Sequence, residues 1–231
     1  MVRALLLSNS TNFGEKYLDH AMPAVRTFLE GVAELVFVPF ALRDRPAYTA
    51  KVAARFAQEG IRVRGLTPHG EGRRVLQDAQ AVFVGGGNTF RLLKTLQDAD
   101  LLGPLGERAR EGLRYMGASA GTNLAGPTIM TTNDMPIVQP AGFVALGLVP
   151  FQINPHYIDA DPASRHMGET REERLREYLE ENDRVVVGLR EGSWLEVEGA
   201  RVTLRGGRAA RIFQRGQEPR ELAADGELGA G

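Results

Sequence analysis

Short apolar runs alternate with amphipathic segments over the first half of the chain. The apolar runs predict strands, at Ala4–Leu7, Leu35–Val38, Ile61–Val63, Ala81–Val84 and Tyr115–Met116. The segments between them predict helices, at Ala21–Leu29, Tyr48–Gln58, Gly72–Gln77 and Thr89–Gln97. Near-continuous apolar strands that alternate with helices are typical of a parallel sheet covered on both faces. About the first 125 residues therefore predict a doubly wound, mostly parallel α/β layer with helices on both faces.

The second half of the chain has a different pattern. Residues Pro127–Pro150 are rich in Pro, Thr and Gly, which predicts loops and a hairpin. An amphipathic helix is expected at Glu169–Glu181. Four β-prone runs follow, at Arg184–Leu189, Ser193–Val197, Arg201–Leu204 and Ala209–Phe213. Because tight Gly-containing turns join them, these runs predict antiparallel strands near the C-terminus.

The pattern indicates one domain rather than two. There is no internal repeat and no linker long enough to separate the halves, so residues 1–216 are expected to form a single α/β domain. The last stretch, residues 217–231, has little apolar surface to bury. We expect it to be a polar, frayed tail.

Composition and charge narrow the classes of function. The 28 Lys and Arg residues nearly balance 29 Asp and Glu, so the net charge of -1 favours neither nucleic acid nor an anionic membrane as partner. No apolar stretch is long enough to cross a membrane, and the N-terminal apolar run is too short for a secretory signal, so the cytoplasm is the expected compartment. The chain has no cysteine, which excludes disulfides, thiolate metal sites and a cysteine nucleophile.

A serine stands where a predicted strand ends and a helix begins. Ser119 is the centre of Gly117-Ala118-Ser119-Ala120-Gly121, and small neighbours suit the sharp turn of a nucleophile elbow. Backbone N–H groups at the start of the following helix would favour a developing oxyanion. The alternative is a common loop pentapeptide in which Ser119 only caps the helix.

Three consecutive glycines, Gly85 to Gly87, follow another predicted strand. Their backbone N–H groups are unshielded, so the loop could hold a phosphate or stabilise an oxyanion. No Gly-Lys-Ser/Thr follows and the dinucleotide spacing is absent, which disfavours a nucleotide site. We expect the N–H groups of Gly87 and Ala120 to form an oxyanion hole, and the alternative is a plain strand-to-helix turn.

A catalytic serine needs a base, and the chain has four histidines. His20 lies in an early helical pattern and His69 in a surface turn, whereas His156 follows a strand-like run, at the edge where doubly wound folds collect their sites. His156 is therefore the expected base, with His166 as the reserve.

The acid that orients the histidine has several candidates. Glu191 follows the strongest late strand and reaches the carboxyl edge of the predicted sheet, and Asp134 lies in a loop that could fold over the site. Asp159 and Asp161 are further possibilities. We favour Glu191.

Several sequence blocks resemble peptidase E, the α-aspartyl dipeptidase family, related in fold to cyanophycinase and to class I glutamine amidotransferases. The blocks occur in the family's order and cover nearly the whole chain: Ala4–Ser10, Gly85–Leu93, Gly117–Asn123, Thr131–Pro136, Asn154–His156, Gly168–Arg171 and Gly188–Ser193. The resemblance implies a class I glutamine amidotransferase-like fold. It also implies a Ser-His-Glu triad that maps onto Ser119, His156 and Glu191, and release of an N-terminal aspartate from short peptides.

An aspartyl preference needs a cation for the substrate carboxylate. Arg171, at the start of the predicted helix, is the expected cation, with Arg165 as another candidate and pairing with its own Glu-rich helix as the alternative. Asn88, Thr131 and Asp134 are further predicted substrate contacts. No metal or organic cofactor is expected. The sequence leaves the oligomeric state open, a homodimer included.

Two rival functions stay open at this point. A cyanophycinase-like enzyme cutting β-aspartyl-arginine units would keep the triad and change the pocket. A small-molecule binding protein on the same fold would carry a vestigial elbow. The order serine, histidine, acid disfavours an ordinary lipase or esterase, in which the acid precedes the histidine.

Overall fold

The first sheet of the protein has seven strands, in the order β3-β2-β4-β5-β1-β8-β9. The computed structural model describes residues 1–161, 163, 165 and 167–229. β1 to β5 are mutually parallel, and β8 and β9 add an antiparallel hairpin beside β1. The strands are β1 Arg3–Leu7, β2 Glu34–Val38, β3 Arg62–Gly65, β4 Ala81–Val84, β5 Arg114–Ala118, β8 Ser193–Glu198 and β9 Arg201–Gly206.

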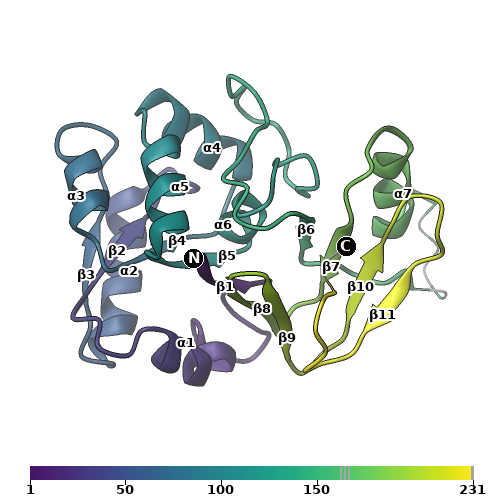
Figure 1. Ribbon diagram of the computed structural model, residues 1–231, viewed down its shortest axis with the longest axis horizontal. Helices are drawn as coiled ribbons and strands as arrows, with labels where there is room; N and C mark the ends of the chain where they lie inside the picture. The colour runs from purple at the N-terminus through teal and green to yellow at the C-terminus, as the bar shows by residue number, and fades with distance from the viewer. Residues whose placement is uncertain (162, 164, 166, 230–231) are drawn as a thin grey trace.

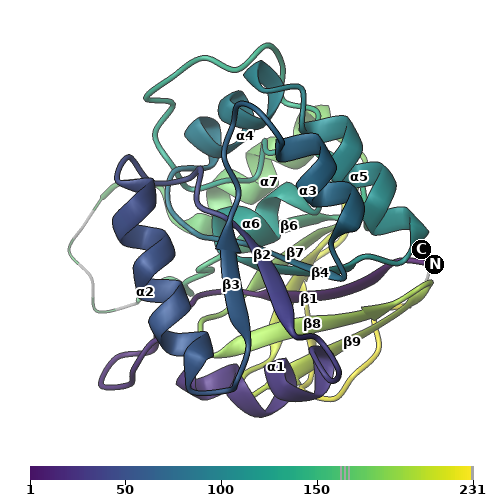
Figure 2. The same cartoon turned by 90° about the vertical axis from the view of Figure 1, so that its left-hand side faces the viewer.

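Helices cover both faces of this sheet (Figures 1 and 2). They do so because its strands present apolar side chains on both faces, and each face must be shielded from water. On one face, η1, α1 and α2 pack against the strand residues Leu5, Phe37 and Phe83. α3 to α6 lie over the other face. The helical elements are η1 Asp19–Ala21, α1 Met22–Phe28, α2 Arg45–Ala57, α3 Gly72–Asp78, α4 Thr89–Asp98, α5 Leu102–Glu111 and α6 Ala120–Leu124. None of the helices in the described part of the chain is long and apolar enough to cross a membrane.

A second, four-stranded sheet lies beside the first, in the order β11-β10-β7-β6 (Figure 1). β6 and β7 are parallel neighbours, and β10 and β11 are antiparallel to the strands beside them. α7 packs on this sheet through Leu175 and Leu179, which meet Tyr157, Val186 and Phe213. The elements are β6 Gln152–Pro155, α7 Arg171–Glu181, β7 Val186–Leu189, β10 Ala210–Phe213 and β11 Arg220–Leu222.

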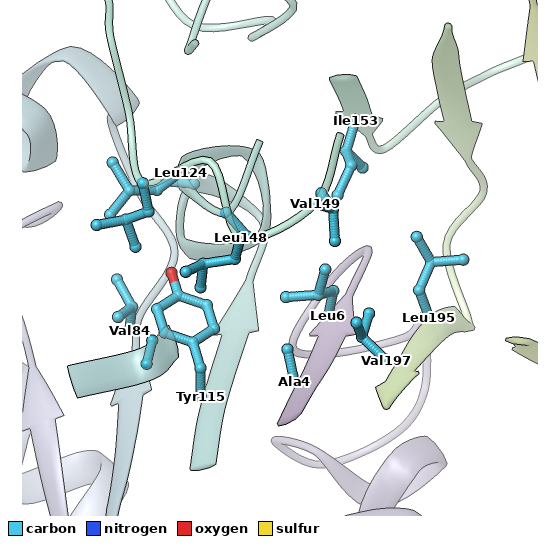
Figure 3. Close-up of a cluster of buried hydrophobic side chains, with 14 of the residues drawn as sticks. Ala4, Leu6, Val84, Tyr115, Leu124, Leu148, Val149, Ile153, Leu195 and Val197 are labelled. Carbon is cyan, nitrogen blue, oxygen red and sulfur yellow. The ribbon is translucent and has the colours of Figure 1, made fainter. Parts of the chain in front are cut away.

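The buried cluster in Figure 3 joins the two sheets. Leu6 and Tyr115 project from the first sheet, and Ile153 projects from β6 toward them. The hydroxyl of Tyr115 is fully buried and donates a 2.6 Å hydrogen bond to the carbonyl oxygen of Gly121. The tyrosine therefore fills the core and also satisfies a backbone acceptor at the start of α6.

The predicted fold class is confirmed, with two differences in its details. The antiparallel strands near the C-terminus are divided between two sheets, because β8 and β9 extend the first sheet and β10 joins β7 in the second. The helix α5 was not predicted, since Gly103, Pro104 and Gly106 weaken its helical pattern. Proline is tolerated there because it falls in the first turn, where the backbone N–H has no partner within the helix.

Residues 217–229 are not the frayed tail that the sequence predicts. β11 pairs with β10, and Leu222 and Leu228 are both buried. The backbone around residues 225–228 also bonds to β9, through Leu204 N–H to Gly226 O and Leu228 N–H to Val202 O. The segment is ordered because two strands offer it unpaired backbone groups, a source of order that its polar composition does not reveal.

Candidate active site

Ser119 lies at a sharp turn between β5 and α6. Its backbone has φ 53° and ψ -108°, a conformation that costs energy for a residue with a side chain. A Cβ atom on Gly121 would lie 2.1 Å from the carbonyl oxygen of Val84, and one on Gly117 would lie 2.6 Å from that of Gly121. Both flanking glycines are therefore required by close backbone approach, as a nucleophile elbow demands.

The structure brings together Ser119, His156 and Glu191. The hydroxyl of Ser119 lies 2.9 Å from Nε2 of His156, and Nδ1 of His156 lies 2.6 Å from a carboxylate oxygen of Glu191. The side chains of His156 and Glu191 are 37% and 48% exposed, so the relay is open to a substrate on one side. Both distances are those of direct hydrogen bonds.

The two partners of Ser119 emerge side by side because β6 and β7 are parallel. Pro155 at the end of β6 is in register with Leu189 at the end of β7, and His156 and Glu191 follow these positions. His156 has a left-handed backbone, with φ 54°, which turns the ring toward Ser119. The sequence predicts that His156 and Glu191 follow the carboxyl ends of strands, and they do. It places those strands in the sheet that carries Ser119, whereas β6 and β7 belong to the second sheet.

This arrangement can activate a hydroxyl. In the neutral ring, Nδ1–H donates to Glu191 and Nε2 accepts from the Ser119 hydroxyl, so the histidine can take the serine proton. The carboxylate holds that tautomer and stabilises the imidazolium that forms. Such a geometry would let Ser119 act as a nucleophile, with His156 as its base and Glu191 as the orienting acid.

The glycine loop after β4 lies against the elbow. A Cβ on Gly86 would come within 3.1 Å of the Cβ of Ser119, and Gly87 has φ 131°. The backbone N–H groups of Gly87 and Ala120 donate to no other residue in the described part of the chain. Because α6 has only five residues, these N–H groups rather than a helix dipole would stabilise an oxyanion.

The three predicted substrate contacts near this loop have different surroundings. Asp134 lines the pocket and accepts hydrogen bonds at one oxygen from the N–H and hydroxyl of Thr89, at 2.7 and 2.6 Å. Asn88 caps α4 through Arg91 N–H and donates to Met135 O. Thr131 is buried and its hydroxyl donates to Ile153 O at 2.8 Å, so it holds the loop on β6. Its role as a substrate contact stays a prediction.

Arg171, the predicted cation, is half-buried at the start of α7. The acids of its own helix have other partners: Glu172 pairs with Arg176 and Arg211, and Glu173 caps Thr170. Partial burial lowers the pKa of the Arg171 guanidinium and Arg174 lowers it further, while the Asp134 carboxylate acts in the opposite direction. Asp134 is thus near enough for its charge to act on Arg171, although Arg171 is not among the residues that line the pocket over Ser119.

The remaining candidates from the sequence lie elsewhere. Asp159 pairs with Arg190 through two oxygens, and Asp161 accepts from Ala163 N–H. His69 lies at an exposed bend, and the side chain of His20 is 5% exposed. His166, the reserve base, lies outside the described residues.

A pocket of about 940 Å³ opens over Ser119 and His156. Its far wall is made by residues that the sequence analysis missed, among them Tyr17, Arg43, Tyr48 and Lys51. The ammonium group of Lys51 lies 4.6 Å from the centre of the Tyr17 ring. The pattern around α2 shows only an amphipathic helix, so nothing local marks these side chains as part of a site.

The described residues contain no candidate metal site, because no group of three or more His, Asp or Glu side chains among them is arranged to hold a metal ion.

Comparison with known proteins gives matches over nearly the whole chain. Peptidase E of Streptomyces coelicolor is 60% identical over 224 residues, which cover 97% of this chain and 92% of that protein. A Drosophila melanogaster protein named "Probable alpha-aspartyl dipeptidase" is 46% identical, over 97% of this chain and 95% of its own. Peptidase E of Citrobacter koseri is 48% identical, over 95% and 97%.

Two solved structures share the fold. A protein from Listeria monocytogenes EGD-e, named "Putative Peptidase E Protein", superposes with a TM-score of 0.69 at 22% identity, covering 90% of this chain and all of the other. A peptidase from an acI-B1 actinobacterium gives 0.72 at 15% identity, covering 99% and 96%. The profile of peptidase family S51 matches residues 4–205, and with these full-length relatives it shows that the chain belongs to peptidase family S51.

Proposed function

We propose that this protein is a serine dipeptidase that hydrolyses the peptide bond after an N-terminal aspartate in short peptides. The observation that carries the proposal is the hydrogen-bonded relay of Ser119, His156 and Glu191, of which Ser119 and His156 line the pocket. Relatives that are 46–60% identical over nearly their whole length are named peptidase E or α-aspartyl dipeptidase, which supports the choice of substrate.

The proposed reaction is acyl transfer to water. The Ser119 oxygen attacks the carbonyl carbon of the aspartyl residue while Nε2 of His156 takes the hydroxyl proton. The N–H groups of Gly87 and Ala120 donate to the oxyanion of the tetrahedral intermediate. His156 then gives its proton to the leaving amine, and the C–N bond breaks. A water molecule, deprotonated by His156, then attacks the acyl carbon. The ester bond to Ser119 breaks as His156 returns the proton to the serine oxygen, and aspartate is released.

Arg171 and Asp134 are the proposed specificity residues. The guanidinium can bind the substrate's β-carboxylate in a two-pronged pair. Asp134 lines the pocket and offers negative charge that suits the N-terminal ammonium of the substrate. Asn88 stays in the proposal as the residue that fixes the loop around Met135 rather than as a direct contact.

A substrate panel tests this function. Purified protein is incubated with dipeptides that begin with Asp, Asn, Glu or N-acetylated Asp, and with β-aspartyl-arginine, and released amino acids are measured. We expect strong release from the free Asp peptide alone. Preference for β-aspartyl-arginine would favour a cyanophycinase-like enzyme. No release, together with no labelling of Ser119 by a fluorophosphonate, would identify a vestigial elbow on a binding protein.

The role of Arg171 has a matched control on its own helix. Losing one partner of a desolvated charge pair costs about 2–5 kcal/mol, and roughly 1.4 kcal/mol is tenfold. Arg171→Met should lower kcat/KM for Asp peptides by roughly thirtyfold to several thousandfold. Arg174→Met, which removes an exposed guanidinium paired with Glu169, should change it little. If Arg171→Met keeps the full preference in kcat/KM for Asp over Asn dipeptides, another cation binds the substrate carboxylate.

Three expectations from the sequence stay predictions. They are a cytoplasmic location, a homodimer, and a single hydrolytic domain, predicted over residues 1–216 and extended by the strand pairing of residues 217–229.

A further inference from the structure

We infer that Ser8 and Asn9, at the carboxyl end of β1, are positioning residues that hold the catalytic triad together. The inference rests on the proposed function, since it assigns a role within the same site. Its basis is the place of β1 in the first sheet. Leu7 is in register with Ala118 of β5 on one side and with Trp194 of β8 on the other. The end of β1 therefore lies between the Ser119 elbow and the turn that carries Glu191.

Three consecutive residues at this end each hold one part of the triad. The carbonyl oxygen of Leu7 accepts from the N–H of Ser119 at 3.1 Å. The hydroxyl oxygen of Ser8 accepts from the N–H of His156 at 2.9 Å. The side-chain oxygen of Asn9 accepts from the N–H of Gly192, the residue after Glu191, at 2.9 Å.

Ser8 also ties the two sheets together. Its hydroxyl donates to the carbonyl oxygen of Leu189 at 2.7 Å, at the end of β7, while it accepts from His156 at the end of β6. The residue is completely buried, so water cannot replace either partner. One hydroxyl thus sets where β6 and β7, two of the four strands of the second sheet, end relative to β1.

This contact matters because His156 has a strained backbone. A non-glycine residue at φ 54° persists only when its surroundings hold it there. Without the Ser8 hydroxyl, the His156 N–H and the Leu189 carbonyl would both lose a buried partner. We expect the imidazole ring to move away from Ser119, and a misplacement of about 1 Å can cost roughly a hundredfold in rate.

Asn9 acts in the same way on the acid. Its amide nitrogen donates to Thr11 O at 3.0 Å and to the Asn12 side chain at 2.8 Å, which keeps the oxygen directed at Gly192. Asn9 also lines the pocket, so its substitution can change substrate binding as well. Ser8 is not among the residues that line this pocket, and it gives the cleaner test.

The test compares Ser8→Ala with Ser193→Ala. Ser193 is equally buried, and its hydroxyl donates to Arg208 O at 2.9 Å without touching a triad side chain. For Ser8→Ala we expect kcat on an Asp dipeptide to fall roughly tenfold to a hundredfold with KM nearly unchanged. Ser193→Ala should keep kcat, although both variants lose hydrogen bonds, two in Ser8→Ala and one in Ser193→Ala, and unfold at lower temperature.

Two measurements read the triad without peptide turnover. One is the rate of Ser119 labelling by a small uncharged fluorophosphonate. The other is the low-field proton NMR signal of His156 Nδ1–H bonded to Glu191. In Ser8→Ala labelling should slow and the signal should shift or broaden. If the wild-type protein cleaves no Asp peptide, the proposed function fails and the NMR signal still tests the inference.

The inference is overturned if Ser8→Ala matches Ser193→Ala in kcat, labelling rate and NMR signal. Should Ser8→Ala not fold, Asn9→Leu carries the test. It keeps the side chain's size and removes the acceptor for Gly192, so the NMR signal should again shift. An unchanged signal and an unchanged kcat in Asn9→Leu would then rule out the positioning role.

Discussion

Glu191 approaches His156 to 2.6 Å, at the ring nitrogen opposite the one that faces Ser119. Asp134, the other candidate acid, instead holds the first residue of α4 through Thr89. Glu191→Ala should therefore lower kcat by about 10⁴, the loss expected when the orienting acid is removed. Asp134→Ala should lower kcat less and also reduce thermal stability, because α4 loses a capping carboxylate. Steady-state kinetics on an Asp dipeptide would decide, and a reversed ranking in kcat would make Asp134 the acid.

Ser119→Ala should abolish nearly all hydrolysis and leave the fold intact, because the hydroxyl contacts His156 rather than a packed core. Adding His156→Ala to this variant should cost little more, since the members of a triad act as a unit. The measurements are kcat of the single and double variants and their circular dichroism spectra. Additive losses in the double variant would contradict the mechanism.

The elbow predicts a sharp difference between two glycines. Gly121→Ala would place a Cβ 2.1 Å from a backbone oxygen of β4, so the turn must open. We expect a destabilisation of at least about 1–3 kcal/mol and loss of activity. Gly103→Ala, in α5 with no atom within 4 Å of the added carbon, should be neutral or stabilise by up to about 1 kcal/mol. Denaturant unfolding checks both, and equal effects would mean that the turn is not close-packed.

His20 predicts a pH dependence of stability. Its side chain is 5% exposed, and neither ring nitrogen has a hydrogen-bond partner among the described residues. Burial lowers the pKa of His20 from its ordinary value of 6.5, although Glu15, Asp19 and Glu191 act in the opposite direction. As the pH falls through 6.5, His20 becomes protonated in the unfolded chain but stays neutral in the folded chain. The free energy of unfolding therefore decreases.

We expect His20→Phe to remove this part of the pH dependence. The free energy of unfolding of both proteins is measured by denaturant titration at pH 7.5 and at pH 5.5. The wild-type protein should lose more stability between the two than the variant does. His69→Gln, at an exposed bend, is the control and should behave like the wild-type protein. A variant that loses as much stability as the wild type would show that His20 is not buried in its neutral form.

The local parts of the fold and site follow from the sequence. The strands of the first sheet and the helices on it, except α5, are visible because burial on one or both faces imposes a period on the apolar positions. Ser119 is recognisable because the elbow is built from five consecutive residues, and Gly117 and Gly121 meet the steric demands of that turn. Burial pattern and backbone conformation are properties of short segments, so a single sequence carries them.

The tertiary structure decided what depends on contacts between distant segments. Only strand pairing puts His156 and Glu191 at the ends of neighbouring strands in a second sheet, and places Ser8 behind them. The same pairing orders the polar residues 217–229, and packing of the loop against β6 buries Thr131. Such contacts are fixed by which strand edges meet and which polar groups find partners in the interior. No periodicity within a segment records those choices, because the partner lies in another segment, between 8 and 148 residues away along the chain.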